Sequence, residues 1–337
     1  MHWADHVAKN TARDRGDIAE EVKRHFSNAE FVELTAVCGL FGQSNRFQDS
    51  MRLPIEEQHE VDKIRTSVRA DPAKLKAYLE RIVEYWPREF PQAMKLKPAA
   101  NAGALPAGGG RRCRVPLLES NTAGPDGARF IAAAHAILGA ATNAVKVWAH
   151  TPHVAKMFVP LYFAFERDGA GSLLPAPLRL MILLKTHHIH RAPYMLAHHT
   201  VLGRLAGLTQ AQLAALSRTD APASAEFAPR ERAAIAWAAL VAPNIAKRDE
   251  AVFNELKKYF SDAQVVEITA LCAIMSNADL IYNALRVPVE PVAEIIALYP
   301  AVGADPARLK RYLEQIVADW PTQWPEIDAG PTPRHVL

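Results

Sequence analysis

The chain has 337 residues, of which 50% are apolar and 22% are charged, so it is long enough for two or three packed globular units. Its net charge of +3 is small and spread out, which argues against nucleic-acid and membrane-surface binding. Three widely spaced cysteines form no disulfide framework and indicate a reducing compartment. The N-terminus lacks the apolar core of a signal peptide, and no apolar run approaches twenty residues. We therefore expect a cytoplasmic protein.

The first ninety residues are repeated near the end of the chain. Residues 7–91 align without a gap with residues 241–325, at a constant offset of 234, and more than a third of the positions are identical. Apolar residues recur at helical spacing in both copies. The expected helix starts are a serine N-cap and an Asp-Pro pair in each copy, namely Ser27, Ser261, Asp71-Pro72 and Asp305-Pro306. A repeat of this length predicts equivalent helical units at the two ends of the chain.

The region between the copies begins with a linker and continues with helices. Residues 97–113 are rich in proline, glycine and alanine, which is typical of a connecting segment. Apolar spacing then predicts one long alanine-rich helix over residues 128–149 and another over residues 151–167. A glycine-rich turn at residues 168–172 leads to the most unusual stretch of the chain, residues 178–209, LRLMILLKTHHIHRAPYMLAHHTVLGRLAGLT.

This stretch holds five of the thirteen histidines of the chain: His187, His188, His190, His198 and His199. Apolar residues at helical spacing lead into the cluster and out of it, while Pro193 interrupts the pattern. Because proline lacks an N–H and restricts the residue before it, we predict two helices that meet near residues 190–193, with Pro193 in the first turn of the second. Thr209 is expected to cap the helix that follows. The histidines would then surround a helix junction, which is a plausible place for a functional site.

No stretch shows the two-residue alternation of a strand, so the predicted fold class is all-α, built from helix pairs. We predict three related helical units. Residues 1–96 form the extra copy, residues 97–113 the linker, residues 114–225 the central unit with the histidines, and residues 226–337 the C-terminal unit.

The histidine stretch resembles the carboxymuconolactone decarboxylase and alkylhydroperoxidase D-like family. LRLMILLK, then A-x-x-M-L-A-H-H, then GRLAGLT follow the order of the family's core helix pair. RVPLL at residues 114–118 resembles the family's usual beginning, and residues 227–285 resemble its second half. The resemblance implies an all-α bundle of that family with an extra half-repeat in front. It also implies a homo-oligomer, either a trimer or a dimer of multi-unit chains.

The redox centre of this family is missing from the sequence. Its cysteine pair would fall at Ala192 and Met195, and the glutamate of its proton relay at Leu180. A dithiol peroxidase needs a thiolate nucleophile with a resolving thiol beside it, so this site is not expected to act as a peroxidase. Cys38 and Cys272 occupy equivalent positions of the repeat within apolar helices, where we expect buried thiols.

The resemblance implies instead a lyase or decarboxylase without a cofactor, acting by general acid–base catalysis on a small oxygenated acid or lactone. His199 is the family histidine that this chain retains, and an imidazole is the side chain that ordinarily titrates near neutrality. We assign His199 as the acid–base group, with Tyr194 as proton donor and His190 as a further catalytic residue. Arg191 is the candidate anchor for a substrate carboxylate, and His198 a second substrate-binding residue.

Two alternatives stay open. Residues eleven apart lie on one face of a helix, so the histidines could gather around a divalent transition metal, with His187, His188 and His190 as candidate ligands. Alternatively the chain is a catalytically inactive structural paralogue. Glu33 and Glu267 align with the position of Leu180 and could lend a carboxylate to the site, although salt-bridge roles on their helices are the simpler interpretation.

Overall fold

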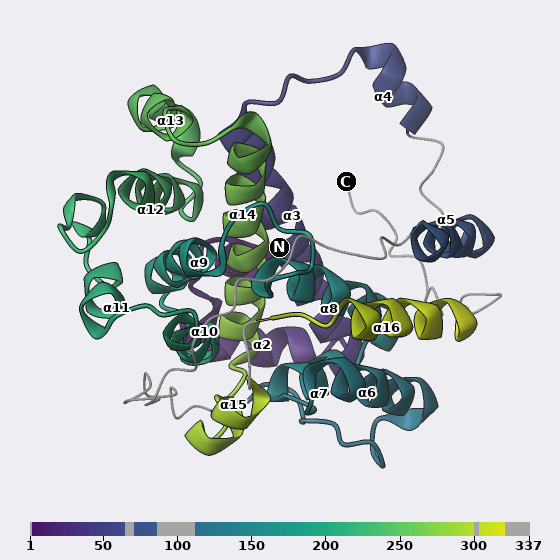
Figure 1. Cartoon of the computed structure of the whole chain (residues 1–337). Coiled ribbons are helices and arrows are strands. Elements are labelled where there is room, and N and C mark those ends of the chain that lie inside the picture. Colours follow the sequence, from purple (N-terminus) through teal and green to yellow (C-terminus); the bar gives the residue numbers. More distant parts are fainter. Residues whose placement is uncertain (1, 65–70, 86–111, 300–302, 321–337) are drawn as a thin grey trace.

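The computed structural model describes residues 2–64, 71–85, 112–299 and 303–320 (Figure 1). These residues form helices and no β-strand, which confirms the predicted fold class. The α-helices are α1 (His2–Ala8), α2 (Gly16–Lys23), α3 (Asn28–Met51), α4 (Gln58–Ile64), α5 (Pro72–Glu84), α6 (Gly124–Leu138), α7 (Asn143–Trp148), α8 (Pro152–Glu166), α9 (Ala176–His190), α10 (Pro193–Leu205), α11 (Gln210–Leu216), α12 (Pro229–Val241), α13 (Glu250–Lys257), α14 (Asp262–Leu285), α15 (Val292–Leu298) and α16 (Pro306–Ala318). Short 3₁₀ turns lie at Ala12–Asp14, Ala221–Ala223 and Ala246–Arg248.

Equivalent positions of the two sequence copies carry helices of equal length. α3 and α14 each have 24 residues and begin after the capping boxes of Ser27 and Ser261, as predicted. α5 and α16 each have 13 residues and begin after Asp71 and Asp305, whose carboxylates accept backbone N–H bonds. The bounds of α2 and α13, and of α4 and α15, differ by the same offset. The repeat in the sequence is therefore also a repeat of helices.

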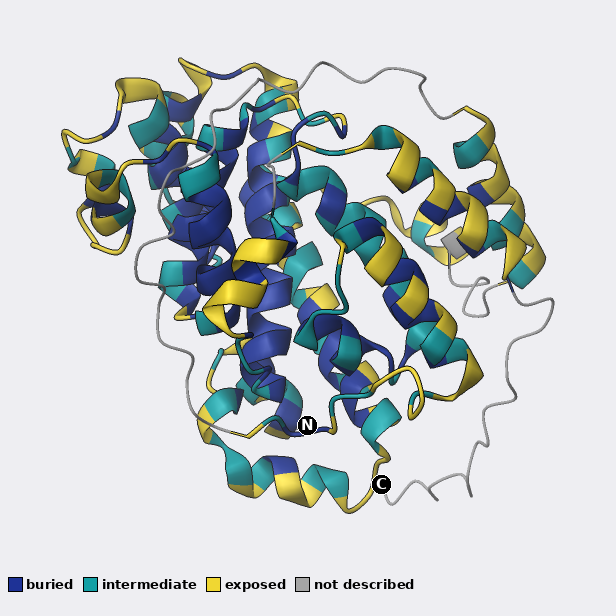
Figure 2. Cartoon of the chain, turned by 60° about the horizontal axis from the view of Figure 1, so that its bottom comes forward, coloured by how far each residue is buried: buried dark blue, intermediate teal, exposed yellow. Residues whose placement is uncertain are grey.

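α14 is the central helix, with α3 and α9 packed along it (Figure 1). Its residues are buried almost without interruption, and α9 is buried to a similar degree (Figure 2). α14 is the one helix within the described ranges with the length and apolarity to cross a bilayer, yet 83% of that window is buried inside the protein. This is the environment of a core helix in a soluble protein. A cytoplasmic location stays a prediction.

The predicted helix junction is present. α9 ends at His190, Arg191 adopts the left-handed conformation with φ 50°, and α10 begins at Pro193. The carbonyl of His190 accepts hydrogen bonds from Asn10 Nδ2 at 2.7 Å and Asn283 Nδ2 at 3.0 Å. The N-terminal segment and the last turn of α14 thus both satisfy the C-terminal end of α9.

The prediction of one long helix over residues 128–149 is wrong. α6 ends at Leu138 because Gly139 takes a left-handed conformation with φ 91°, which favours glycine. α7 begins afresh after Thr142, whose hydroxyl accepts from the Val145 N–H at 3.2 Å. The neighbouring prediction over residues 151–167 is confirmed by α8. The linker at residues 97–113 falls almost entirely outside the described residues, so the predicted unit boundaries stay predictions.

Candidate active site

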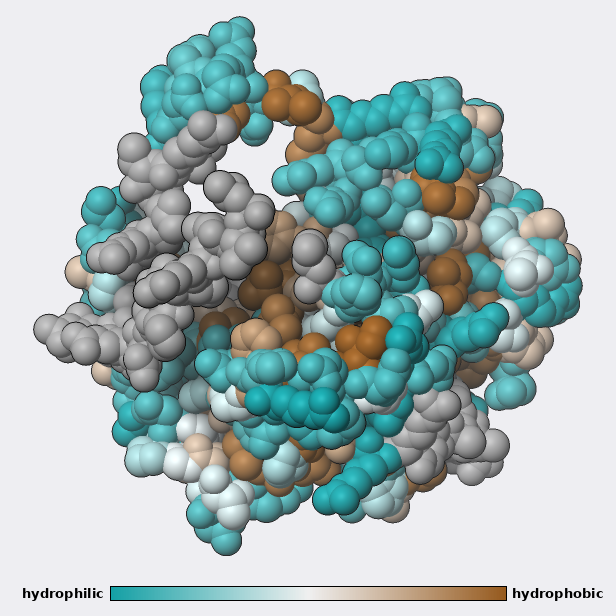
Figure 3. Space-filling view, turned by 180° about the vertical axis from the view of Figure 1, so that it is seen from behind, coloured by the Kyte–Doolittle hydropathy of each residue, from teal (hydrophilic) through white to brown (hydrophobic). Residues whose placement is uncertain are grey.

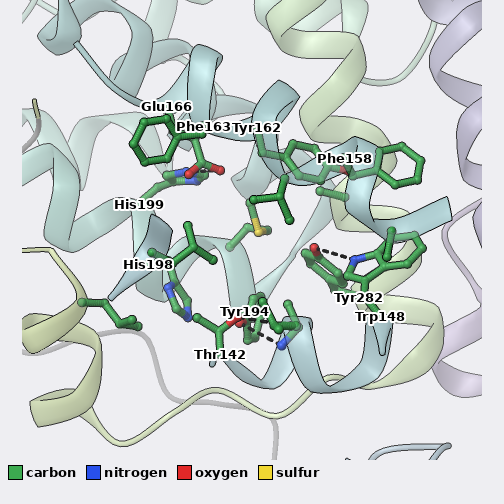
Figure 4. A pocket seen from close by; sticks show the side chains of 18 of the residues that line it. Thr142, Trp148, Phe158, Tyr162, Phe163, Glu166, Tyr194, His198, His199 and Tyr282 are labelled. Atoms are coloured by element: carbon green, nitrogen blue, oxygen red, sulfur yellow. Dashed lines mark hydrogen bonds and ion pairs between the residues drawn. The ribbon is translucent and has the colours of Figure 1, made fainter. Parts of the chain in front are cut away.

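A cavity of about 90 Å³ lies beside the helix junction. Its walls come from α6, α7, α8, α10 and α14, with Leu298 and Tyr299 closing one side. Most of the lining is apolar or aromatic. Apart from the tyrosines, the polar or charged side chains of the lining are those of Thr142, Glu166, Arg167, His198 and His199. In Figure 4, Glu166 and His199 lie together on one side, while Thr142, Tyr194 and His198 lie on the other.

Four side chains from four helices form a continuous chain of contacts that ends at this cavity. Both carboxyl oxygens of Asp279 (α14) lie near His187 Nδ1 (α9), at 2.7 and 2.9 Å. His187 Nε2 lies 2.7 Å from His199 Nδ1 (α10), and His199 Nε2 lies 3.5 Å from Glu166 Oε1 (α8). Asp279 and His187 are fully buried, His199 is 1% exposed, and the Glu166 side chain is 16% exposed. We call these four residues the acid–histidine chain.

The two imidazoles of the chain meet edge to edge. Their planes differ by 7°, and their ring centroids are 4.8 Å apart although the nearest nitrogens are only 2.7 Å apart. Two stacked rings could not bring their nitrogens this close, because their planes would have to lie more than about 3 Å apart. The two rings therefore lie side by side in nearly the same plane. This is the geometry that a linear N–H···N hydrogen bond between imidazoles requires. His187 and His199 can therefore pass a proton between them.

Burial sets the protonation of the chain. It raises the pKa of Asp279 to about 8 and lowers the pKa of His187 to about 3, because a charged form without water is unfavourable. Burial also lowers the pKa of His199, against the effect of Glu166. For Glu166 itself, burial favours the acid, but the hydrogen bond and charge of His199 outweigh it and leave the pKa below its usual value.

One arrangement of protons satisfies every member of the chain near neutral pH. The protonated carboxyl of Asp279 donates to His187 Nδ1, and His187 Nε2–H donates to His199 Nδ1. His199 Nε2–H then points to the Glu166 carboxylate. A concerted shift along the same bonds yields the mirror state, with Glu166 protonated and Asp279 ionised. The chain can therefore both withdraw a proton from the cavity and supply one.

A second polar network holds the opposite wall of the cavity. Glu290 Oε1 accepts from the Tyr194 hydroxyl at 3.0 Å and from the Asn143 N–H at 2.6 Å. Glu290 Oε2 lies 2.7 Å from His198 Nε2, and His198 Nδ1 lies 2.7 Å from the Tyr299 hydroxyl. Burial raises the pKa of Glu290, but the hydrogen bond and charge of His198 lower it below its usual value overall. This network fixes α10 against α7 and the segment after α14.

These contacts change the roles predicted for Tyr194 and His198. Both side chains line the cavity, as expected for site residues. However, the Tyr194 hydroxyl gives its only proton to Glu290, and both ring nitrogens of His198 already have partners. They therefore position the wall of the site, whereas the predicted acid–base residue His199 is the histidine that reaches the cavity with a relay behind it.

Four predicted residues do not line the cavity: His187, which belongs to the acid–histidine chain, and His188, His190 and Arg191. His190 is buried, and its Nε2 lies 2.9 Å from Ser276 Oγ. Arg191 is exposed at the C-terminal end of α9, and His188 is half-buried. Neither His190 nor Arg191 lines this cavity, so the cavity does not support the assignments of His190 as a catalytic residue and of Arg191 as substrate anchor, which stay predictions. The cause is the turn of α9, whose last residues face α14 or solvent instead of α8.

The predicted metal ligands His187, His188 and His190 do not converge. Both ring nitrogens of His187 are taken by Asp279 and His199, and His190 contacts Ser276. Within the ranges that the structure describes, no three His, Cys, Asp or Glu side chains form a group suited to a metal ion. The metal alternative thus has no ligand set among these residues.

The acids of the site were missed in the sequence. Glu166, Asp279 and Glu290 lie far from the histidines along the chain, and only the fold brings them together. One signal was present, since Asp279 is the only acid in the apolar stretch from Ile268 to Leu285 of α14, and buried acids are rare unless they have partners. Glu267, the suggested carboxylate donor, instead contacts the Ser172 hydroxyl and the Leu173 N–H.

The thiols lie away from the cavity. Cys272 is fully buried in α14, and burial raises its pKa to about 12. Cys38 and Cys113 are half-buried, and none of the three lines the cavity. The cavity itself has Met195 where the family's redox pair would end, so it offers no thiolate.

The fold and the site thus define an all-α helical bundle with a buried acid–histidine chain at an aromatic cavity. Residues 152–240, which include α8 to α11 and nearly all of α12, match the model of the carboxymuconolactone decarboxylase family. The resemblance predicted from the histidine stretch is confirmed. Glu166, His187 and His199 fall within the matched residues, whereas Asp279 and Glu290 lie beyond them.

Two solved structures are similar in part. One is the debrominase Bmp8 without ligand, with 21% sequence identity and a TM-score of 0.42, covering 60% of this chain and 96% of that one. The other is a cysteine-to-alanine variant of Bmp8 in complex with 2,3,4-tribromopyrrole, with 22% identity and a TM-score of 0.43, covering 54% of this chain and 94% of that one. Among curated proteins, none matches this sequence.

Proposed function

We propose that this protein is a lyase or decarboxylase that acts by general acid–base catalysis on a small oxygenated acid or lactone. The observation that carries the proposal is the acid–histidine chain, which connects a buried carboxyl group at Asp279 to the cavity at Glu166 and His199. The proposal needs no thiol and no cofactor.

The Glu166–His199 pair is the proposed acid–base group. A general acid or base must lie within reach of the reacting atom and must be able to change protonation near the working pH. Glu166 and His199 both line the cavity and face each other at 3.5 Å, so one proton serves both. His187 and Asp279 stand behind them and hold a second proton in reserve.

A decarboxylation shows how the bonds, electrons and protons would balance in such a reaction. The carbon–carbon bond to the carboxylate breaks, CO₂ leaves, and the electron pair stays on the substrate carbon. That carbon then takes one proton from the Glu166–His199 pair. A proton from Asp279 moves along His187 to His199 and restores the pair, and the negative charge resides on Asp279 until solvent returns a proton. The aromatic lining keeps water from quenching the carbanion at other positions.

Turnover of small γ-lactone carboxylic acids and β-keto acids in D₂O, followed by NMR, tests this proposal. The purified full-length chain should release CO₂ or open the ring and place one deuterium on the product carbon. Glu166→Gln and His199→Ala should each lower kcat by about 10²-fold or more. His135→Ala, on the exposed side of α6, is the control and should keep full activity.

Two results would decide against the proposal. Full activity of His199→Ala would remove the acid–base role, and no turnover of any compound in the panel would favour the inactive paralogue. Metal analysis of protein purified without a histidine tag is a separate measurement. One equivalent of bound transition metal that activity requires would revive the metal alternative.

A further inference from the structure

The lining of the active-site cavity selects for flat rings. Eight of its 21 lining residues are aromatic, whereas aromatic residues make up 8% of the chain. The ring of Phe158 lies 5.1 Å from that of Trp148 and stacks on Tyr162 at 5.9 Å, and the Trp148 N–H donates to the Tyr282 hydroxyl at 3.1 Å. Figure 4 shows these side chains along one side of the cavity. We call Trp148, Phe158, Tyr162 and Tyr282 the aromatic wall.

An aromatic wall prefers a planar unsaturated ligand over a saturated one. Ring faces carry negative and ring edges positive partial charge, so two aromatic systems attract each other in offset or edge-to-face contacts. The same faces repel anions, which makes this lining poorly suited to a ligand with several carboxylates. The ligand should therefore be a ring with a single acidic group.

Arg167 is the lining residue whose guanidinium can pair with that acidic group. It is the only lysine or arginine among the cavity-lining residues of the described part of the chain, and it is 5% exposed. Its guanidinium lies over the ring of Tyr299 at 4.7 Å and over Phe163 at 5.8 Å. Stacking of this kind holds the planar fork in place, and such a fork matches one carboxylate.

A second polar group of the cavity faces an empty position. The Tyr162 hydroxyl is buried, and no hydrogen-bond partner for it is found within the described residues. A buried hydroxyl without a partner is unfavourable, and most such groups in folded proteins are satisfied. Because Tyr162 lines the cavity, an oxygen atom of the ligand would supply the missing partner.

We propose that the cavity binds a single-ring aromatic monocarboxylate that carries one further oxygen substituent. The ring packs on the aromatic wall, the carboxylate pairs with Arg167, and the substituent accepts a hydrogen bond from Tyr162. The Glu166–His199 pair then lies beside the bound ring. This inference rests on the proposed function and narrows its substrate class.

Calorimetric titration of the full-length protein tests the ligand class. The probes are the three hydroxybenzoate isomers, benzoate, and cyclohexanecarboxylate, which has the same charge without the flat ring. Benzoate should bind about five- to tenfold more tightly than cyclohexanecarboxylate, and at least one hydroxybenzoate more tightly than benzoate. Equal affinity for the flat and the saturated acid, or no binding of any probe, would overturn the inference.

Three variants separate the contributions. Phe158→Leu keeps an apolar wall without the ring and should remove the preference for benzoate over cyclohexanecarboxylate. Phe165→Leu, on the same helix but outside the cavity lining, is the matched control and should keep it. Tyr162→Phe should remove only the advantage of the hydroxybenzoate. Preferences that survive both Phe158→Leu and Tyr162→Phe would contradict the proposal.

Binding and turnover distinguish this inference from the proposed function. Glu166→Gln should still bind the hydroxybenzoate, at least as tightly as the parent protein does, because the substitution removes a proton-transfer group and a negative charge beside the bound anion. Selective binding without turnover by the parent protein would leave the ligand class standing and count against the proposed reaction. Turnover of aliphatic lactone acids without binding of aromatic acids would support the proposed reaction and overturn the inferred ligand class.

Discussion

Asp279 of α14 and Asn45 of α3 occupy equivalent positions of the repeat, yet only one of them can hold a reserve proton. Asp279 is fully buried against His187, whereas Asn45 is exposed. Ser276 of α14, which contacts His190, is likewise replaced by Gly42 in α3. A few substitutions on a duplicated helix therefore separate the unit with the acid–histidine chain from the unit without it.

Asp279→Asn tests the reserve proton. The amide can still donate to His187 Nδ1, so the buried contact survives, but it cannot release a proton into the chain. We expect a folded protein whose kcat is lower by about 10²-fold, as for other losses of a proton-transfer group. Steady-state kinetics would show it, with Asp49→Asn on α3 as the control. An unchanged kcat would mean that the chain ends functionally at His199.

Asp279 should also make the free energy of unfolding depend on pH. Its pKa is raised to about 8 in the folded protein, against about 3.9 in an unfolded chain. Between these values the unfolded state has released a proton that the folded state keeps. Rising pH therefore destabilises the protein, by up to about 1.4 kcal/mol per pH unit from this one group.

The Asp279→Asn variant lacks this dependence. The free energy of unfolding of the variant, minus that of the parent, should increase from about pH 5 to about pH 7.5. Urea unfolding followed by circular dichroism at both pH values gives the difference directly. The pKa of His187 is lowered to about 3, which also makes stability depend on pH. This contribution is the same in the parent and the variant, so it cancels when the two free energies of unfolding are subtracted. A difference that does not change with pH would show that Asp279 is ionised in the fold.

At the scale of elements, the crossing of α3 and α14 depends on a glycine. A Cβ atom at Gly39 would clash with Asn277 Oδ1 and lie 2.9 Å from Ile281 Cγ1. Gly39 therefore lets the middle of α3 approach the C-terminal half of α14 closely. Both contacted atoms belong to buried side chains of α14, which have little space to move aside.

Gly39→Ala should destabilise the protein by about 1–3 kcal/mol, because the cost of overpacking exceeds the gain in helix propensity. Gly42→Ala, one turn further along α3, is the matched control. Its Cβ would lie 3.0 Å from Arg46 Nη1 and 3.7 Å from Leu280 Cδ1, a much looser fit than at Gly39, so the loss of stability should be clearly smaller than for Gly39→Ala. Equal effects of the two substitutions in urea unfolding would contradict this account of the crossing.

For the whole molecule, the N-terminal copy serves the site indirectly. α3 covers one side of α14, and Arg46 of α3 is buried with its Nε donating to the Ala242 carbonyl at 2.8 Å. The positive charge of Arg46 opposes the rise that burial gives to the pKa of Asp279. Asn10 caps α9 at the helix junction. The extra copy therefore contributes to the electrostatic surroundings of the acid–histidine chain without lining the cavity.

α3 also exposes apolar side chains that its counterpart buries. Val37, Leu40 and Phe41 are 51%, 40% and 64% exposed. Their equivalents in α14, where α9 and α12 pack, are buried, namely Leu271, Ile274 and Met275. Seen from behind (Figure 3), hydrophobic residues reach the surface in several patches, including the connection from α3 to α4, where Leu53 and Ile55 are exposed. Exposed apolar patches of this kind mark interaction surfaces.

We predict that this face of α3 packs against a second copy of the chain in a homo-oligomer. Light scattering coupled to size-exclusion chromatography should give a multiple of the single-chain mass. Phe41→Glu should shift the protein towards the single chain without loss of helicity, because Phe41 is already exposed in the isolated fold. Tyr78→Glu, an equally exposed aromatic position on α5, is the control. A single-chain mass for the parent would refute the prediction.

Much of the fold could be predicted from local chemistry. The serine N-caps of α3 and α14, the Asp-Pro starts of α5 and α16, and the junction at Pro193 are set by residues that act on their own neighbours. The one helix predicted wrongly, over residues 128–149, failed because a run of alanines masked Gly139, whose left-handed conformation ends α6. Of the residues that line the cavity, the sequence identified His199, Tyr194 and His198, because these three lie in one short stretch of the chain.

By itself, the sequence determined the helices, their duplication, the family of the central segment and the absence of thiols from its core motif, because these follow from spacing and residue type along one stretch of chain. Only the tertiary structure decided which histidines reach the cavity and which acids stand beside them. Glu166, Asp279 and Glu290 come from three separate segments, and their contacts with His199, His187 and His198 exist only once the helices pack. Proton transfer depends on ångström-scale distances between such groups, and those distances are a property of packing.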